Sequence, residues 1–195
     1  MLVIACVLLG VLAVPLTGGR LSALAGVHLR DRWTLAVAVA AQVVALELVS
    51  HAGGVARLVH LLTYVLAGVF VVRNRRVPGL VLLGFGAALN ALTISLNSGT
   101  LPADPGALAR AGVEPEPGAF VNSGVVDDAY LWFLGDVFAW PEPMPLANVF
   151  SVGDVLIVVG AVWGVHRICR RRRPDRSDGT GTRVRDTVGR EHRAT

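Results

Sequence analysis

Lysine is absent from this sequence, and charged residues of every kind are scarce. All 18 basic residues are arginine, and charged residues make up 16% of the 195 positions, whereas soluble domains carry roughly 25%. Hydrophobic residues reach 53%, and the mean hydropathy is +0.59. This composition argues against an ordinary soluble domain and predicts an integral membrane protein whose main partner is the lipid bilayer. We expect no nucleic-acid partner, because the arginines stand in short clusters beside apolar runs, where they report topology.

Cysteine is also rare, and no positive charge precedes the first apolar run. Cys6 and Cys169 fall at opposite ends of the predicted membrane segments, too far apart for a disulfide, which needs Cα atoms within about 7 Å. A secretory signal begins with a basic region, and the first basic residue is Arg20. We therefore expect the first apolar run to be a retained helix.

Five apolar runs dominate the chain, and they predict an all-α integral membrane bundle. The five transmembrane helices are expected at about residues 2–17, 33–50, 55–72, 79–96 and 152–169. Each is somewhat shorter than the roughly 20 residues of a perpendicular span. Together with an outer loop, 97–150, they form a predicted transmembrane domain, 1–173. The remaining 174–195 mixes both charge signs with Gly and Thr, which is typical of a disordered tail.

Arginine alternates between the connections in a way that predicts orientation. Three arginines separate the first and second runs and three more separate the third and fourth, whereas one separates the second and third. Four consecutive arginines follow the fifth run: Arg170, Arg171, Arg172 and Arg173. Because basic connections stay in the cytoplasm, the N-terminus is expected outside and the C-terminus, with the tail, inside.

The predicted outer loop carries a short helix and an aromatic segment. Asp104 suits an N-cap, Pro105 the first helical position, and Gly112 the residue past the end. The run "YLWFLGDVFAW", residues 130–140, is too short to span and rich in rings that favour the headgroup level. We expect it to lie in the outer leaflet against the bundle.

Polar residues near the outer ends of the apolar runs predict a binding pocket. Asn90, Thr93 and Asn97 are spaced i, i+3, i+7 and so share one helix face. Polar groups within a membrane are costly, face the bundle interior and often mark function. The candidate exofacial pocket, polar and net acidic, is lined by Glu47, His51, Asn90, Thr93, Asn97, Asp136 and Asp154.

Two aspartates follow glycine, in Gly135-Asp136 and Gly153-Asp154, and have simpler explanations too. "SVGD" fits a capping box, with Ser151 as N-cap and Asp154 reaching back to its amide; capping is our main interpretation of Asp154. Asp136 lies among aromatic residues, and its structural role is less obvious than that of Asp154. It either caps a second short helix after Gly135 or turns toward the pocket.

The other candidates also have structural alternatives. Asn90 and Thr93 suit hydrogen bonds between membrane helices, and Glu47 and His51, one helical turn apart, suit an interfacial pair. The basic cluster of Arg170, Arg171, Arg172 and Arg173 faces lipid and serves mainly as a topology anchor, with binding of anionic lipid as the alternative.

No catalytic or cofactor signature is present: the chain lacks His-Glu-x-x-His, Gly-x-Ser-x-Gly, a phosphate loop and Cys-x-x-Cys. We predict no cofactor and no metal, and a non-enzymatic membrane protein with a pocket for a small ligand or protein partner. One alternative is a transporter or cation-pathway subunit. A pathway would need polar residues reaching the cytoplasmic ends of the helices, and Gln42 is the only polar residue expected that deep in the membrane. Another is an outward-facing enzyme acting on lipid or cell-envelope precursors. Another membrane protein or a second copy of the chain is a further candidate partner.

The order of several short stretches resembles a known family. The stretches are "GGRLSAL" (18–24), "NRRVPGL" (74–80), "LNALTISLNSGTLP" (89–102), "FLGD" (133–136) and "FSVGDVL" (150–156). They resemble a family of small bacterial multi-pass membrane proteins catalogued as a domain of unknown function. The resemblance implies a location in the bacterial cytoplasmic (inner) membrane. It supplies no activity and no catalytic residue.

Overall fold

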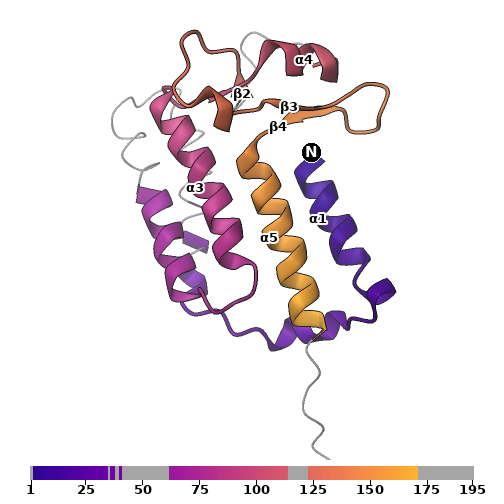
Figure 1. Cartoon of the computed structure of the whole chain (residues 1–195). Coiled ribbons are helices and arrows are strands. Elements are labelled where there is room, and N and C mark those ends of the chain that lie inside the picture. Colours follow the sequence, from indigo (N-terminus) through magenta and orange to yellow (C-terminus); the bar gives the residue numbers. More distant parts are fainter. Residues whose placement is uncertain (1, 35, 38–39, 41–61, 114–122, 171–195) are drawn as a thin grey trace, which may run out of the picture.

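Apolar helices stand side by side beneath a small cap in the computed structural model, which describes residues 2–34, 36–37, 40, 62–113 and 123–170 (Figure 1). The labelled helices of this layer are α1 (Leu2–Leu12), α3 (Leu80–Leu96) and α5 (Val152–Cys169). The described residues between α3 and α5 form the cap, which lies across one end of the layer, on the side where α1 begins.

Glycines bring α3 and α5 into direct backbone contact. A Cβ at Gly160 would lie 2.6 Å from the amide nitrogen of Leu83, and one at Gly86 would collide with the carbonyl oxygen of Gly153. One turn beyond Gly160, a Cβ at Gly164 would meet the carbonyl oxygen of Pro78. The Gly160–Gly164 spacing is the small-residue pattern that lets apolar helices approach closely. Glycine is therefore required along this face of α5 by space alone.

α1 packs on α5, and its end is set by a proline. The helix stops at Leu12 and is followed by short 3₁₀ turns, η1 (Pro15–Thr17) and η2 (Leu21–Gly26), because proline cannot continue the α-helical hydrogen bonds. His166 of α5 holds α1, with its Nε2 2.9 Å from the carbonyl oxygen of Gly10.

A buried asparagine, 4% exposed, ties the connection after η2 to the helix Leu62–Arg73. The Asn74 side chain accepts a hydrogen bond from the Arg30 amide at 2.7 Å and donates to the Arg30 carbonyl at 2.9 Å. These bonds fix the basic connections to each other at the end of the layer opposite the cap.

The described residues of the cap form one short α-helix, one 3₁₀ turn and two two-stranded sheets. β1 (Leu101–Pro102) pairs in parallel with β2 (Ser123–Gly124), and β3 (Phe138–Trp140) pairs antiparallel with β4 (Asn148–Phe150). α4 (Pro105–Ala111) begins at Asp104, whose side chain accepts from the Ala107 amide, and ends at a left-handed Gly112, as the sequence predicts. The apolar core of the cap consists of Ala103, Ala107, Leu108, Ala111 and Val149.

The prediction of an all-α bundle of five transmembrane helices is wrong. In the described part of the chain, only α5 is long and apolar enough to cross a membrane, by length and composition. The other apolar helices, Leu2–Leu12, Leu62–Arg73 and Leu80–Leu96, are shorter. The cap also contains strands, because apolar content sets neither the length of a helix nor the backbone pairing of a loop.

Several predicted boundaries fall partly or wholly outside the described residues. The predicted helix 33–50, the first part of 55–72 and the tail 174–195 belong to this group. The predicted helix 2–17 is shorter than expected, since α1 ends at Leu12. α3 and α5 occupy Leu80–Leu96 and Val152–Cys169, where the sequence places helices over 79–96 and 152–169.

Of the four arginines in the predicted basic cluster, only Arg170 belongs to the described residues. Arg170 is the C-cap of α5 and is exposed. The other three members, Arg171, Arg172 and Arg173, lie outside the described residues. The expectation that the four side chains face lipid as a group therefore stays a prediction.

Adding a methyl group at Gly160 should separate α3 from α5. Overpacking a tight contact costs about 1–3 kcal/mol, and the backbone of Leu83 cannot move away as a side-chain end would. Gly160→Ala should therefore lower the midpoint of thermal unfolding, measured by circular dichroism on the purified protein.

Gly68→Ala is the matched control, because Gly68 also lies in an apolar helix but a Cβ there would meet nothing within 4 Å. It should be neutral or stabilising by up to about 1 kcal/mol, the helix-propensity gain of alanine over glycine. Equal midpoints for the two variants would contradict the direct backbone contact.

Candidate buried acidic site

Asn90 joins α3 to the first turn of α5. Its Nδ2 donates to Asp154 Oδ1 at 3.0 Å, and its Oδ1 accepts from Ser151 Oγ at 2.9 Å. Ser151 and Asp154 form the capping box: the Asp154 amide donates to Ser151 Oγ at 3.0 Å, and the Ser151 amide donates to Asp154 Oδ2 at 3.2 Å. Both carboxylate oxygens of Asp154 thus have partners, so its first role is structural.

Thr93 and Asn97, which share the helix face of Asn90, also have hydrogen-bond partners. Thr93 is fully buried and donates to the Leu89 carbonyl one turn earlier in the same helix. Asn97 donates to the Tyr130 carbonyl and accepts from the Tyr130 amide, both at 2.9 Å. Asn97 therefore fixes the start of the aromatic segment to the end of α3. Asn90 and Asn97 thus connect α3 to neighbouring elements, while Thr93 bonds within its own helix.

The backbone places Asp136 beside β1. The Asp136 amide donates to the Pro102 carbonyl at 2.8 Å, and the Asp104 amide donates to the Asp136 carbonyl at 3.1 Å. A Cβ at Gly135 would collide with the same Pro102 carbonyl, so only glycine permits this approach. The proposed capping of a second helix after Gly135 is wrong, because the short 3₁₀ turn η3 (Trp132–Leu134) ends before Gly135 and Asp136 is extended and bridged to Ala103.

The Asp136 side chain is 5% exposed and only half satisfied. Its Oδ2 accepts from Ser123 Oγ at 2.5 Å, while its Oδ1 is buried with no hydrogen-bond partner among the described residues. Burial raises the pKa of Asp136 from its ordinary 3.8 to about 6; the Ser123 bond opposes this, and the charge of Asp154 adds to it. The two aspartates that follow glycine therefore influence each other in the folded chain.

Among the described site residues, Asn90, Thr93 and Asn97 make no hydrogen bond to Asp136. Glu47 and His51 lie outside the described residues. The described residues include no group of three or more His, Cys, Asp or Glu side chains that could hold a metal ion. The prediction that the protein has no cofactor stays a prediction.

Sequence reasoning did not single out Ser123, which is the one hydrogen-bond partner of the Asp136 carboxylate in the described structure. No local signal identifies it, since it lies 13 residues from Asp136 in a polar stretch.

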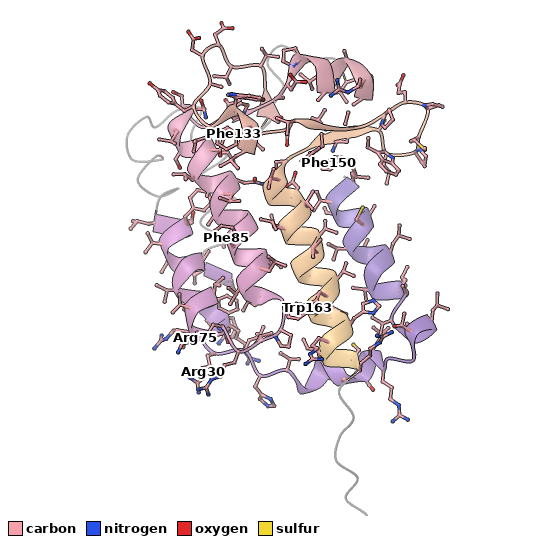
Figure 2. All side chains as sticks on the ribbon, in the orientation of Figure 1. Arg30, Arg75, Phe85, Phe133, Phe150 and Trp163 are labelled. Carbon is pink, nitrogen blue, oxygen red and sulfur yellow. The ribbon has the colours of Figure 1, made fainter. Side chains whose placement is uncertain are left out.

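The aromatic segment of the cap exposes its rings. Tyr130, Trp132 and Phe133 are each more than half exposed, and Trp132 and Phe133 meet edge to face. Figure 2 shows Phe133 near the junction of the cap with α3. The position of the aromatic segment in the outer leaflet stays a prediction.

In its described residues, this chain is thus a small, mainly helical protein whose mixed cap buries one incompletely paired carboxyl, that of Asp136. The chain belongs to a family of unknown function, DUF5317, whose model matches residues 26–166. This confirms the part of the expected resemblance that concerns a family of unknown function. An uncharacterized protein from Thermotoga maritima is 29% identical over 99 residues, which cover 51% of this chain and 57% of that protein. The chain thus spans a little over half the length of that relative. No solved structure matches the chain.

Asp136 should make stability depend on pH. Because its pKa is raised in the folded state, Asp136 keeps its proton between about pH 4 and 6 while the unfolded chain loses it, so the free energy of unfolding falls as pH rises through this window. The change is worth about 3 kcal/mol. Relative to the parent, Asp136→Asn should gain about this much between pH 4 and 7, measured by thermal or chemical unfolding.

Asp128→Asn is the control, because Asp128 is exposed and its left-handed backbone, φ 51°, suits asparagine. Its stability relative to the parent should not vary over the same pH range. A constant difference between Asp136→Asn and the parent would contradict the raised pKa.

Proposed function

We propose that this chain is an integral membrane protein that binds a small positively charged ligand in its cap, at Asp136. The helices beneath the cap support membrane insertion, because they present large apolar side chains outward. Leu9 and Leu12 are 66% exposed and Phe85 is 57% exposed, and Figure 2 shows Phe85 on α3 in the middle of the helical layer. Large exposed apolar surface on a protein marks an interaction with lipid or with another protein. Helices shorter than a full span insert where the bilayer thins or subunits assemble.

The separation of charge supports an orientation with the cap outside. The described acidic side chains of the cap include Asp104, Asp127, Asp128, Asp136 and Glu142. The opposite end carries the arginine-rich connections, including Arg30 and Arg75, which Figure 2 labels at the bottom of the layer. Because basic connections stay in the cytoplasm, we place the cap and the N-terminus outside and the end of α5 inside, in the bacterial cytoplasmic membrane.

The unpartnered Oδ1 of Asp136 carries the ligand proposal. A buried acceptor without a donor costs about 1–3 kcal/mol, and more when it is charged. A ligand that supplies a cation or a charged N–H group removes this cost. Asp154 adds a second negative charge in the surroundings of Asp136, which favours a positive ligand over a neutral donor. Protons compete for the same oxygen, so binding requires a pH above about 6.

Two other functions fit the described residues less well. A cation pathway needs polar groups along the layer, but below Asn90 the contact between α3 and α5 is made by glycine backbones such as Gly86 and Gly160. Gln42, the deep polar residue, lies outside the described residues. An outward-facing enzyme would use Asp136 or Asp154 as its acid or base. Both carboxylate oxygens of Asp154 are held by Asn90 and Ser151, and the one described hydrogen-bond partner of the Asp136 carboxylate is Ser123.

The orientation predicts which cysteine substitutions react in whole cells. With Cys6→Ala and Cys169→Ala as background, Asp128→Cys in the cap should react with a membrane-impermeant maleimide in intact cells. Arg32→Cys at the basic end should react only after permeabilisation. The reverse pattern would overturn the orientation, and recovery of the protein in the soluble fraction after alkaline extraction would overturn membrane insertion.

The ligand proposal predicts stabilisation by cations that depends on Asp136. At pH 7.5, at least one of Ca²⁺, Mg²⁺ or spermidine should raise the thermal midpoint of the detergent-purified parent, because a ligand that binds only the folded state stabilises it. The effect should vanish in Asp136→Asn, and the parent's affinity should fall up to about tenfold per pH unit below pH 6. Asp128→Asn should respond like the parent. A shift of equal size in Asp136→Asn, or none in the parent with any of the three probes, would overturn this site.

A further inference from the structure

A second candidate site lies at the opposite end of the molecule from Asp136. The side chains of Trp163, His166, Arg167 and Arg170 line a cavity of about 380 Å³ at the C-terminal end of α5. Figure 2 shows Trp163 on this lower part of α5, at the end away from the cap. The cavity is open to its surroundings, because Trp163, Arg167 and Arg170 are exposed, so it can enclose only part of a ligand.

The cavity is positively charged, and none of its described lining residues is acidic. The described ion pairs use Arg73 and Arg110, and no described carboxylate lies within salt-bridge distance of Arg167 or Arg170. Both side chains are exposed. Arg170 Nε donates to the Thr17 carbonyl at 3.2 Å, which fixes the guanidinium against the end of η1. Arginine has five N–H donors, so this bond leaves most of them for a ligand.

The other two walls suit an anion at the membrane surface. His166 is held in place from both ring nitrogens, with Nε2 2.9 Å from the Gly10 carbonyl and Nδ1 3.2 Å from Thr17 Oγ1. A carbonyl only accepts, so Nε2 carries a proton. Trp163 is 53% exposed, and its ring gives an apolar wall beside the charges. Tryptophan at this level is typical of the region where headgroups and acyl chains meet.

Basic residues at the C-terminus of a helix have a simpler role, because they complement the helix dipole. That role explains Arg167 and Arg170 individually. It does not explain a cavity between them with an aromatic wall and an anchored imidazole. Arginine pairs with phosphate through two parallel N–H bonds, which a planar guanidinium supplies in fixed geometry.

We infer that this cavity binds a phosphate-bearing anion through Arg167 and Arg170, with Trp163 beside the group that carries the phosphate. Two sources share this chemistry, the headgroup of an anionic phospholipid and free phosphate. The lipid source rests on the membrane insertion proposed for the chain, with this end at the cytoplasmic leaflet. The site itself rests only on the cavity and its charges.

Binding of soluble ligands to the detergent-purified full chain tests the site. Dihexanoylphosphatidylglycerol, inorganic phosphate and dihexanoylphosphatidylcholine are titrated separately by calorimetry. We expect saturable binding of the phosphatidylglycerol that weakens with added salt, and none of the phosphatidylcholine, whose headgroup has no net charge. Much tighter binding of phosphatidylglycerol than of phosphate assigns the site to lipid, and equal binding assigns it to free phosphate.

Arg167→Gln combined with Arg170→Gln should weaken binding by at least about tenfold, because two charge-assisted hydrogen-bonding groups are lost. Arg75→Gln combined with Arg76→Gln is the matched control: it removes the same charge at the same end, from exposed residues that do not line the cavity. This control and Asp136→Asn should bind like the parent, which separates the result from the cation site in the cap.

Circular dichroism and the thermal midpoint establish that each variant is folded. Should the Arg167 and Arg170 pair fail to fold, Trp163→Ala is the second variant, and it should weaken phosphatidylglycerol more than phosphate. Equal weakening in the two arginine pairs, or no saturable binding of phosphatidylglycerol or phosphate to the parent, would overturn the site.

Discussion

Direct contact between the backbones of α3 and α5 positions the rest of the described structure. Gly160 and Gly86 leave no room for a Cβ, so the two helices approach more closely than side chains would allow. Their upper ends then lie together, which lets Asn90 reach the first turn of α5. β1 follows α3 and β4 precedes α5, so the same contact holds both edges of the cap. The cap is therefore a consequence of the helix pair beneath it.

Asp136 is buried because the cap closes around it from several directions. The Pro102 carbonyl draws its backbone toward β1, and Ser123 supplies its single described side-chain partner. One oxygen is left without a donor among the described residues, and burial raises the pKa of Asp136 to about 6. Imperfect satisfaction of a buried charge costs stability, and such costs are concentrated at functional sites. The basic cavity at the far end of α5 has the opposite charge, which gives the molecule two chemically distinct ends.

Sequence reasoning succeeded where a structure depends on neighbouring residues and failed where it depends on length or on distant segments. The apolar runs before and after the cap predict helices where α3 and α5 lie. The expectation of five spans fails because hydropathy does not limit helix length; Pro15 and the turns after it end the first helix early. The all-α loop fails because β3 and β4 form through backbone pairing between segments that have no distinctive hydropathy.

The sequence by itself determined the local features of this protein. The capping box of Ser151 and Asp154 and the start of α4 at Asp104 each depend on hydrogen bonds within three residues. Only the tertiary structure decided the surroundings of Asp136. Ser123 lies 13 residues away and Asp154 lies further along the chain. No helix or strand pattern in the sequence links either residue to Asp136. Residues at such distances along the chain come near one another only when the cap has folded onto α3 and α5, which the local sequence does not determine.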